Sequence, residues 1–203
     1  MAFFKGRGSD LKEEGIDASR VPPGQYLTDR FPVLHAGSVP RVDLTSWDFT
    51  VEGLVDREVT FTLDEIKAMP TTDKVTDIHC VTKWSKLDTV WHGVEVPEFM
   101  SGFELAPSAS HVLVWAEHGF TANLPVEDFL RPENLLAWRF GGEDLDPDHG
   151  WPLRLVVPHL YFWKSVKWVR GFRFLDHDEP GFWERNGYHM YGDPFREQRY
   201  WGD

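Results

Sequence analysis

The feature of this chain that most constrains its fold is a series of short strand-like segments separated by few, short helices. Apolar and polar residues alternate with the period of a β-strand in several segments, and other segments are short apolar runs. The strand candidates are WDFTVEG (47–53), VTFT (59–62), KVTDIHCV (74–81), HVLVWAE (111–117), LLAWRF (135–140), LRLVVP (153–158) and KWVRGFRFL (167–175), while TVWHGVEV (89–96) fits a strand or a turn. A doubly wound parallel sheet requires regular alternation of strand and helix, which is missing, so the pattern predicts an α+β fold with mixed β-sheets and short helices.

Short helices are expected at three places. The first follows the strand at 59–62, where Thr62 and Glu65 have the spacing of a capping box and Thr62 is the expected N-cap. The others are PEFMSGFEL (97–105) and PVEDFL (125–130). The segment after residue 175 is polar and aromatic with little periodicity, so no regular element is expected there.

Residues 1–45 differ from the rest of the chain in composition, with charged residues and frequent glycine and proline. The interrupting residues are Gly6, Gly8, Pro22, Pro23, Gly24, Pro32 and Pro40. We expect an extended N-terminal arm at 1–45 and one domain at 46–203, because the chain length fits a single domain. No apolar run is long enough for a signal-peptide core or a membrane span, which predicts a cytoplasmic protein without a membrane span.

The charge of the chain is unevenly distributed. The formal net charge of −12 argues against nucleic-acid binding, which needs a basic face. Yet the segment from His149 to Leu175 contains no Asp or Glu and has five cations, namely Arg154, Lys164, Lys167, Arg170 and Arg173. Such a segment in an acidic protein predicts a bound anion such as a phosphate, with Ser165 as a further hydroxyl donor. Chance clustering is the alternative.

Cys80 is the single cysteine, so no internal disulfide is possible. By itself it fits a small buried apolar residue. Three basic neighbours, His79, Lys83 and Lys86, favour the thiolate, which is a soft metal ligand. A cysteine protease is a weaker alternative, because any of nine histidines can be paired with the cysteine by chance. The histidine spacings match no zinc-binding motif.

Three segments carry a resemblance to a known family. DIHCVTKWSKLDTVWHGVEV (77–96) resembles the metal-ligand segment of the molybdenum-cofactor domain of the sulfite oxidase family. HGWPLRLVVPHLYFWKSVKWVRG (149–171) resembles the pterin-binding segment, and PGFWERNGYHMYGDPF (180–195) resembles the tail of small stand-alone bacterial members. The resemblance covers most of the chain from about residue 26 and implies the sulfite oxidase molybdopterin-binding fold.

The resemblance also implies a site. Its cofactor is molybdenum held by molybdopterin, in its plain rather than nucleotide-extended form, and by the thiolate of Cys80. The cofactor contacts implied by matching positions are Arg30, Phe31, His35, Ala116, His149, Arg154, Ser165, Val166 and Lys167. Lys83 and His92 are candidates beside the metal for binding a substrate oxyanion. Trp84 and Trp91 are candidate pocket walls or core residues.

The implied activity is oxygen-atom transfer on a small sulfur- or nitrogen-containing substrate, with an external electron donor or acceptor. Both sulfite oxidation and reduction of an S- or N-oxide fit, and the motif C-V-x-x-W is similar to bacterial relatives that reduce methionine sulfoxide. One alternative is a family member that binds or carries the cofactor without turnover. Another is an α+β scaffold with a structural cysteine and an incidental basic strand.

Overall fold

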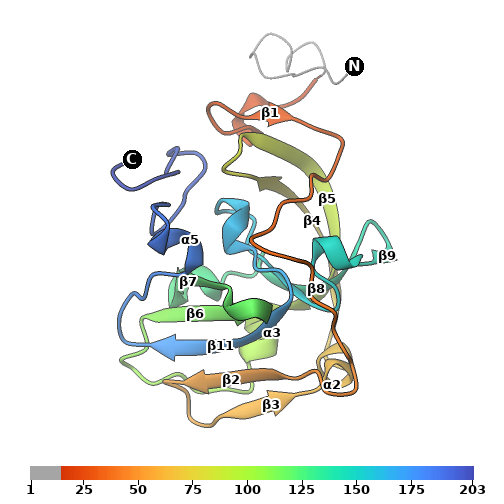
Figure 1. Ribbon diagram of the computed structural model, residues 1–203, viewed down its shortest axis with the longest axis vertical. Helices are drawn as coiled ribbons and strands as arrows, with labels where there is room; N and C mark the ends of the chain where they lie inside the picture. Colours follow the sequence, from red (N-terminus) through yellow and green to blue (C-terminus); the bar gives the residue numbers. More distant parts are fainter. Residues whose placement is uncertain (1–14) are drawn as a thin grey trace.

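The computed structural model describes residues 15–203, and the first 14 residues of the predicted arm lie outside it. Two mixed sheets form the body of the protein (Figure 1). The strands of the first sheet are β1 (Tyr26–Leu27), β4 (Thr72–His79), β5 (Trp84–Glu95), β8 (Leu135–Phe140), β9 (Glu143–Asp144) and β10 (Arg154–Val156). In the second sheet the order is β3 (Val59–Phe61), β2 (Phe49–Gly53), β11 (Val169–Leu175), β6 (His111–Ala116) and β7 (Thr121–Pro125).

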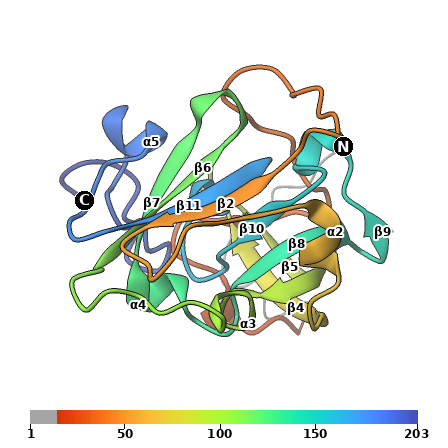
Figure 2. The ribbon, with the colours of Figure 1, turned by 90° about the horizontal axis from the view of Figure 1, so that it is seen from below.

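The sheets are mixed because one strand pair in each is parallel. These pairs are β1 with β5 and β11 with β2, and the other pairings are antiparallel. Seen from below, the two sheets lie as adjoining layers (Figure 2). The helices are short: α2 (Leu63–Lys67), α3 (Val96–Met100), α4 (Val126–Phe129), α5 (Phe182–Arg185), and the 3₁₀ turns η1 (Ala18–Arg20), η2 (Glu117–Gly119), η3 (Pro147–His149) and η4 (Phe162–Lys164). The α+β prediction is confirmed.

Local sequence patterns predicted several elements correctly. The predicted capping box is present: the Thr62 backbone N–H donates to Glu65 Oε2 at 2.8 Å, and the Glu65 N–H donates to Thr62 Oγ1 at 3.3 Å. The strand predicted at 135–140 matches β8. Of the segment 89–96, residues 89–95 belong to the longer strand β5, and Val96 is the first residue of α3.

Three strands and one α-helix were not predicted. The two-residue strand β1 interrupts the arm, β7 precedes α4, the two-residue strand β9 follows β8, and α5 interrupts the C-terminal segment. The sequence of β7 is only TANLP, without strand periodicity, and its full-length antiparallel pairing with β6 makes it a strand. Tertiary pairing therefore overrides weak local preference at these places.

Buried side chains form two clusters. The larger one contains the inner faces of the second sheet and residues of the flanking helices, with Phe49, Phe129 and Phe172 among its fully buried rings. The smaller cluster lies against the first sheet and includes Cys80 and Trp84. Close approach of β5 to β8 requires Gly93, since a Cβ there would lie 2.0 Å from the Leu136 carbonyl oxygen.

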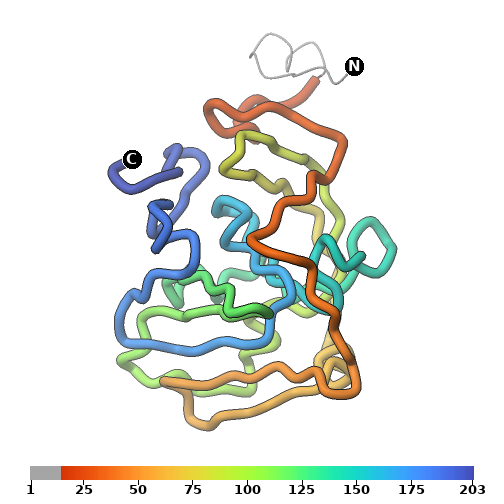
Figure 3. Tube along the Cα trace, viewed as in Figure 1, coloured from red at the N-terminus to blue at the C-terminus, as the bar shows by residue number. Residues whose placement is uncertain are grey.

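The arm runs along the outside of the first sheet and then across to the second. The backbone N–H groups of Tyr26 and Thr28 donate to the carbonyls of Lys83 and Ser85, at 2.8 and 3.0 Å. From there the chain crosses the face of the molecule to reach β2 (Figure 3). The division of arm from domain at residue 45 stays a prediction. Within residues 15–203, no helix combines the length and apolar character of a bilayer span.

Candidate functional site

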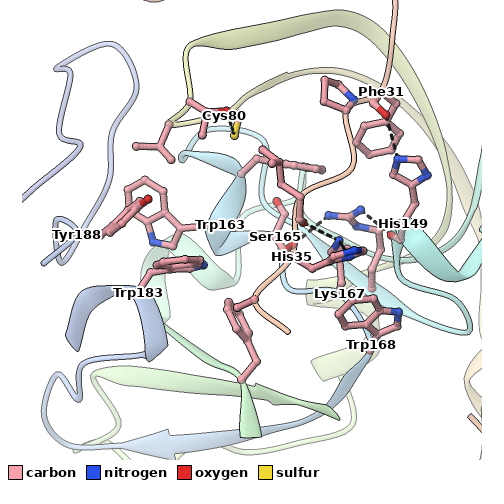
Figure 4. Close-up of a pocket in the computed structure, with 18 of the residues that line it drawn as sticks. Phe31, His35, Cys80, His149, Trp163, Ser165, Lys167, Trp168, Trp183 and Tyr188 are labelled. Atoms are coloured by element: carbon pink, nitrogen blue, oxygen red, sulfur yellow. Dashed lines mark hydrogen bonds between the residues drawn. The ribbon is translucent and has the colours of Figure 1, made fainter. Parts of the chain in front are cut away.

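A cavity of about 260 Å³ lies where four parts of the chain meet. They are the arm, the residues around Cys80, the C-terminal tail, and the segment from His149 to Leu175 without Asp or Glu, which we call the acid-free segment. The C-terminal tail comprises residues 181–203. The side chains that line the cavity include Phe31, His35, Cys80, His149, Ser165 and Lys167, all of them predicted site residues. In Figure 4 the aromatic rings of Trp163, Trp183 and Tyr188 lie on one side of the cavity, and His149, Lys167 and Trp168 lie on the other. Segments distant in sequence therefore build one site.

Cys80 is the first residue of the turn between β4 and β5. This Cys80 turn comprises residues 80–83 and is closed by two backbone bonds, from the Cys80 N–H to the Trp84 carbonyl at 2.8 Å and from the Lys83 N–H to the Cys80 carbonyl at 3.0 Å. Lys83 has a φ of 75°, in the left-handed region. The thiol lines the cavity, 3.1 Å from Thr82 Oγ1, and Cys80 is 8% exposed. A tight turn thus fixes the direction of the sulfur.

The expected activation of Cys80 by its sequence neighbours needs correction. Burial is the largest influence and raises the pKa of the Cys80 thiol. Burial also lowers the pKa of His79 to about 4, so this histidine is neutral near pH 7. Lys86 donates to the Asp29 carbonyl at 2.7 Å. Sequence proximity did not bring positive charge to the sulfur, because His79 is neutral, Lys86 is bound to the arm and Lys83 is exposed.

Arg154 is the unusual group of the site. Its side chain is fully buried, and Nη1 and Nη2 donate to the carbonyls of His149 and Ser165, at 2.7 and 3.0 Å. No carboxylate among residues 15–203 lies within ion-pair distance, and Nε has no partner there. Burial lowers the Arg154 pKa to about 9. A buried cation without a counter-ion is costly, and a bound anion would remove that cost.

Lys167 is the second cation of the cavity. Its ammonium donates to the carbonyls of Leu34 and Asp148, at 2.8 and 2.9 Å, and to His35 Nδ1 at 3.1 Å. Burial, followed by the charge of Arg154, lowers the Lys167 pKa to about 7. Gly150 allows the two cations to approach, since a Cβ there would lie 3.1 Å from Arg154 Cβ and 3.2 Å from Lys167 Cβ.

The other three cations of the acid-free segment do not serve the cavity. Lys164 is paired with Glu184 at 2.7 Å, and Arg170 with Asp48 and Glu117. Arg173 is paired with Glu52 at 2.5 Å. These carboxylates come from distant parts of the chain. Of the five cations, Arg154 and Lys167 are therefore the two without a carboxylate at ion-pair distance among residues 15–203.

The arm forms one wall of the cavity through Phe31 and His35. The Phe31 ring stacks on His149 with centroids 3.9 Å apart, and the Phe31 carbonyl lies 3.2 Å from His149 Nε2. The His35 ring stacks on Trp168 at 5.6 Å. The arm therefore passes beside the cavity, and rings from the acid-free segment contact it at both positions.

Several predicted residues do not line the cavity. Arg30 is exposed, while Ala116 and Val166 are buried in the larger core. Trp91 is a core residue whose Nε1 donates to Thr89 Oγ1, whereas Trp84 does line the cavity. Ser165 lines it too, but its hydroxyl oxygen accepts the Val157 N–H at 2.8 Å.

Lys83 and His92 require a correction of position. Lys83 is exposed at the end of the Cys80 turn and does not line the cavity. His92 lies far along β5, opposite Asp73, and its Nδ1 is 2.9 Å from Asp73 Oδ1. Both residues were candidates for a place beside the metal, but the turn leaves the Lys83 side chain exposed and the extended strand β5 carries His92 far from Cys80.

Trp163, Trp183 and Tyr188 form an aromatic wall of the cavity, and none of the three was among the predicted site residues. Ring centroids of Trp163 and Tyr188 are 5.2 Å apart, and those of Trp183 and Tyr188 are 4.9 Å apart. Two of the three rings belong to the tail, which has no periodicity that would mark them. Their close spacing in FWERNGY (182–188) was the available signal.

The wall is attached to the body through a buried ion pair. Lys164 and Glu184 are both fully buried, and the Trp163 indole N–H donates to Glu184 Oε1 at 2.8 Å. We expect Glu184→Gln to lower the free energy of unfolding by roughly 3–5 kcal/mol, because it leaves the buried ammonium without its carboxylate. Urea unfolding measures this change. Glu197→Gln, at a half-exposed carboxylate of the same tail, is the control, and equal small losses in both variants would contradict the prediction.

The donor set of the site fits molybdopterin. No group of three or more His, Cys, Asp or Glu side chains within residues 15–203 is arranged to hold a metal ion. A metal bound at Cys80 would therefore take its further ligands from a cofactor. Arg154, with a buried unpartnered N–H, and Lys167 fit an anionic group of that cofactor, and the surrounding rings fit a planar one.

Comparisons with known proteins identify the family of this chain. A family model described as "Oxidoreductase molybdopterin binding domain" matches residues 36–183. The chain is 49% identical over 204 residues to the protein named "Uncharacterized oxidoreductase YuiH" of Bacillus subtilis (strain 168), with 100% of both chains covered. It is 27% identical to the protein-methionine-sulfoxide reductase catalytic subunit MsrP of Gluconobacter oxydans (strain 621H), over 72% of this chain and 52% of that protein.

Two relatives of lower sequence identity are also similar to this chain. Identity to the sulfite oxidase of Arabidopsis thaliana is 24%, over 82% of this chain and 52% of the relative. The chain thus spans about half the length of these two longer relatives. The crystal structure of the sulfane dehydrogenase SoxCD from Paracoccus pantotrophus shares the fold, with a TM-score of 0.67 and 20% identity over 76% of this chain and 44% of that one. The chain belongs to the oxidoreductase molybdopterin binding domain family, as a small oxidoreductase of the sulfite oxidase type whose cofactor is Mo-molybdopterin.

Proposed function

We propose that this protein catalyses oxygen-atom transfer on a small sulfur- or nitrogen-containing substrate, with Cys80 as the protein ligand to molybdenum. The observation that carries the proposal is the shared cavity, in which the Cys80 thiol and the uncompensated cation Arg154 face the same space. When bound, the molybdenum cofactor supplies two-electron chemistry and accepts or gives the oxygen atom.

The chain itself contributes binding, orientation and exclusion of water. Arg154 and Lys167 would hold the anionic part of the cofactor, and the stacked rings of Phe31 and His149 would shield it from water. The Cys80 turn fixes the direction of the sulfur ligand. Three predicted cofactor contacts, Arg30, Ala116 and Val166, stay predictions. Ala116 and Val166 could contact the cofactor only through their backbone groups, and Arg30 only after a small movement of the arm.

The aromatic side of the cavity favours reduction of an S- or N-oxide over oxidation of sulfite. Trp163, Trp183 and Tyr188 offer aromatic faces and no cation, whereas a sulfite anion calls for charged partners. Methyl groups and dipolar oxides suit such faces. Reduction of the oxide consumes two electrons and two protons and releases water, so an external electron donor completes the reaction.

The test uses protein produced in a host that makes molybdopterin. We expect about one Mo per chain and pterin fluorescence after acid release, as a site for one cofactor requires. Activity is then screened with sulfite, methionine sulfoxide, trimethylamine N-oxide and dimethyl sulfoxide, using an artificial electron carrier. Turnover of an oxide supports the proposal, and turnover of sulfite alone overturns the preferred direction.

Two other outcomes are informative. Bound cofactor without turnover of any substrate would favour a carrier that binds the cofactor. Protein without Mo and pterin would contradict the proposed site. The cytoplasmic location expected from the sequence belongs to the same proposal, and fractionation of the source cell tests it.

Anion binding by cofactor-free protein should depend on pH through Lys167. Its pKa of about 7 means that the ammonium form, which an anion prefers, is lost as the pH rises through 7. Binding raises this pKa, so sulfate affinity should be highest below pH 7 and should fall up to about tenfold per pH unit above it. Calorimetry with sulfate between pH 6 and 9 measures the trend.

The control for this trend is Lys167→Met, which should bind sulfate weakly at every pH. Charged or titratable groups near the ammonium are Arg154, His35, Asp146, Asp148 and His149. Burial and the charge of Lys167 lower the pKa of His35, which keeps His35 neutral above pH 7. An unchanged pH dependence in Lys167→Met would assign it to another of these groups.

A further inference from the structure

We propose that Arg199 and Gln25 are positioning residues that hold the Cys80 turn in the geometry needed for metal ligation. The inference rests on the proposed role of Cys80. Arg199 belongs to the tail and Gln25 to the arm, and both lie outside the residues 36–183 that match the family model. The ligand-bearing turn is thus fixed by the two ends of the described chain.

Arg199 holds the carbonyl next to the ligand. Its Nη1 donates to the Val81 carbonyl at 2.7 Å, and its Nη2 to the Pro23 carbonyl at 3.3 Å. The guanidinium lies over the Tyr161 ring, 4.9 Å from its centroid, and Arg199 is only 7% exposed. The nearest acidic partner, Glu197, is 3.8 Å away and half exposed. Backbone carbonyls and a ring are therefore the main partners of this charge.

Gln25 holds the carbonyl of the ligand residue itself. Its Nε2 donates to the Cys80 carbonyl at 3.0 Å, and Gln25 is 3% exposed. The Cys80 carbonyl also accepts the Lys83 N–H. The carbonyls of Cys80 and Val81 are consequently fixed by side chains from opposite ends of the chain, in addition to the bonds within the turn.

The hydrogen bonds from Gln25 and Arg199 restrict rotation of the two peptide planes that follow Cys80. The neighbouring N–H of Cys80 is already held by the Trp84 carbonyl. With both sides of the residue fixed, the thiol keeps one direction into the cavity. Changes in groups that orient a metal ligand typically cost roughly 10- to 100-fold in affinity or activity, although such groups never touch the metal.

The test compares Arg199→Met, Arg199→Lys and Gln25→Met with the natural holoenzyme. In Arg199→Met we expect kcat to fall roughly tenfold or more with little change in KM, and the Mo(V) resonance to shift, because the ligand direction changes while the substrate wall stays. Arg199→Lys keeps the charge and one bond, so it should recover part of kcat. Arg196→Met removes an exposed arginine of the same tail and should behave like the natural protein.

A second readout needs neither metal nor activity. In cofactor-free protein, hydrogen exchange at the amides of Cys80 and Lys83 should be faster in Arg199→Met and Gln25→Met than in Arg196→Met. If Arg199→Met fails to fold, Gln25→Met, which removes one bond only, decides with the same readouts. The inference would be overturned if Gln25→Met leaves both the Mo(V) resonance and the amide hydrogen exchange unchanged. This holds whatever Arg199→Met shows.

The outcome also separates this inference from the proposed function. If Cys80→Ser leaves the Mo(V) resonance unchanged, the role of Cys80 fails, whatever the Arg199 variants show. If Cys80→Ser alters the resonance and the Arg199 and Gln25 variants do not, only the positioning role is wrong.

Discussion

Cys80→Ser is expected to abolish turnover while the fold is retained. A serine oxygen is a hard ligand and does not replace a soft thiolate at molybdenum. Loss of groups that merely orient a ligand costs roughly 10- to 100-fold, and loss of the ligand itself should exceed that range. The serine hydroxyl can keep the contact with Thr82 Oγ1, so the free energy of unfolding should fall by no more than about 1–3 kcal/mol.

Three measurements check this prediction together. Turnover of the active substrate should be lost, the Mo(V) resonance should change, and the circular dichroism and urea unfolding of cofactor-free protein should stay close to those of the natural chain. Retained turnover with an unchanged resonance would remove Cys80 from the metal site. Loss of turnover together with unfolding would point to a structural role for the cysteine instead.

Arg154→Met should separate stability from cofactor retention. The substitution removes a buried cation that has no carboxylate partner, so cofactor-free protein should be as stable as the natural chain or more stable, by up to roughly 1–4 kcal/mol. Cofactor affinity should fall roughly 10- to 100-fold, because the anion loses a charge-assisted hydrogen bond. A residue that serves only the fold would show the opposite stability change.

The measurements are Mo content after dialysis and urea unfolding of the cofactor-free protein. The matched control is Arg173→Met, since Arg173 belongs to the same acid-free segment but lies on the surface and is paired with Glu52. It should keep the Mo content of the natural chain. Full Mo content in Arg154→Met, or an equal loss in both variants, would contradict the role of Arg154 as the anion partner.

Much of the fold could be predicted because its signals are local. The capping box of Thr62 and Glu65, the alternation in β2 and the apolar run of β6 depend on residues within one element, and the structure confirms them. The strand β7 could not be predicted, since its pairing with β6 rather than its own sequence makes it a strand. The helix α5 interrupts a segment that shows no periodicity.

The candidate site shows the same limit more sharply. Phe31, Cys80 and Arg154 were identified from motifs, and the structure brings them to one cavity. Lys83 and His92 were also near Cys80 in sequence, but the turn and the long strand direct them elsewhere. Along a strand a small separation in sequence becomes a large separation in space, because each residue extends the strand by about 3.3 Å.

By itself, the sequence determined the α+β class, the family motifs and the residues most suited to metal and anion binding. Only the tertiary structure decided which charges remain free. Of the five cations in the acid-free segment, distant carboxylates pair with three, and Arg154 and Lys167 line the cavity without an ion-pair partner in the described part of the chain. The tertiary structure also supplied the aromatic wall and the contacts of Arg199 and Gln25 with the Cys80 turn. The physical reason is that pairing and burial depend on which segments meet, and that is a property of the whole chain.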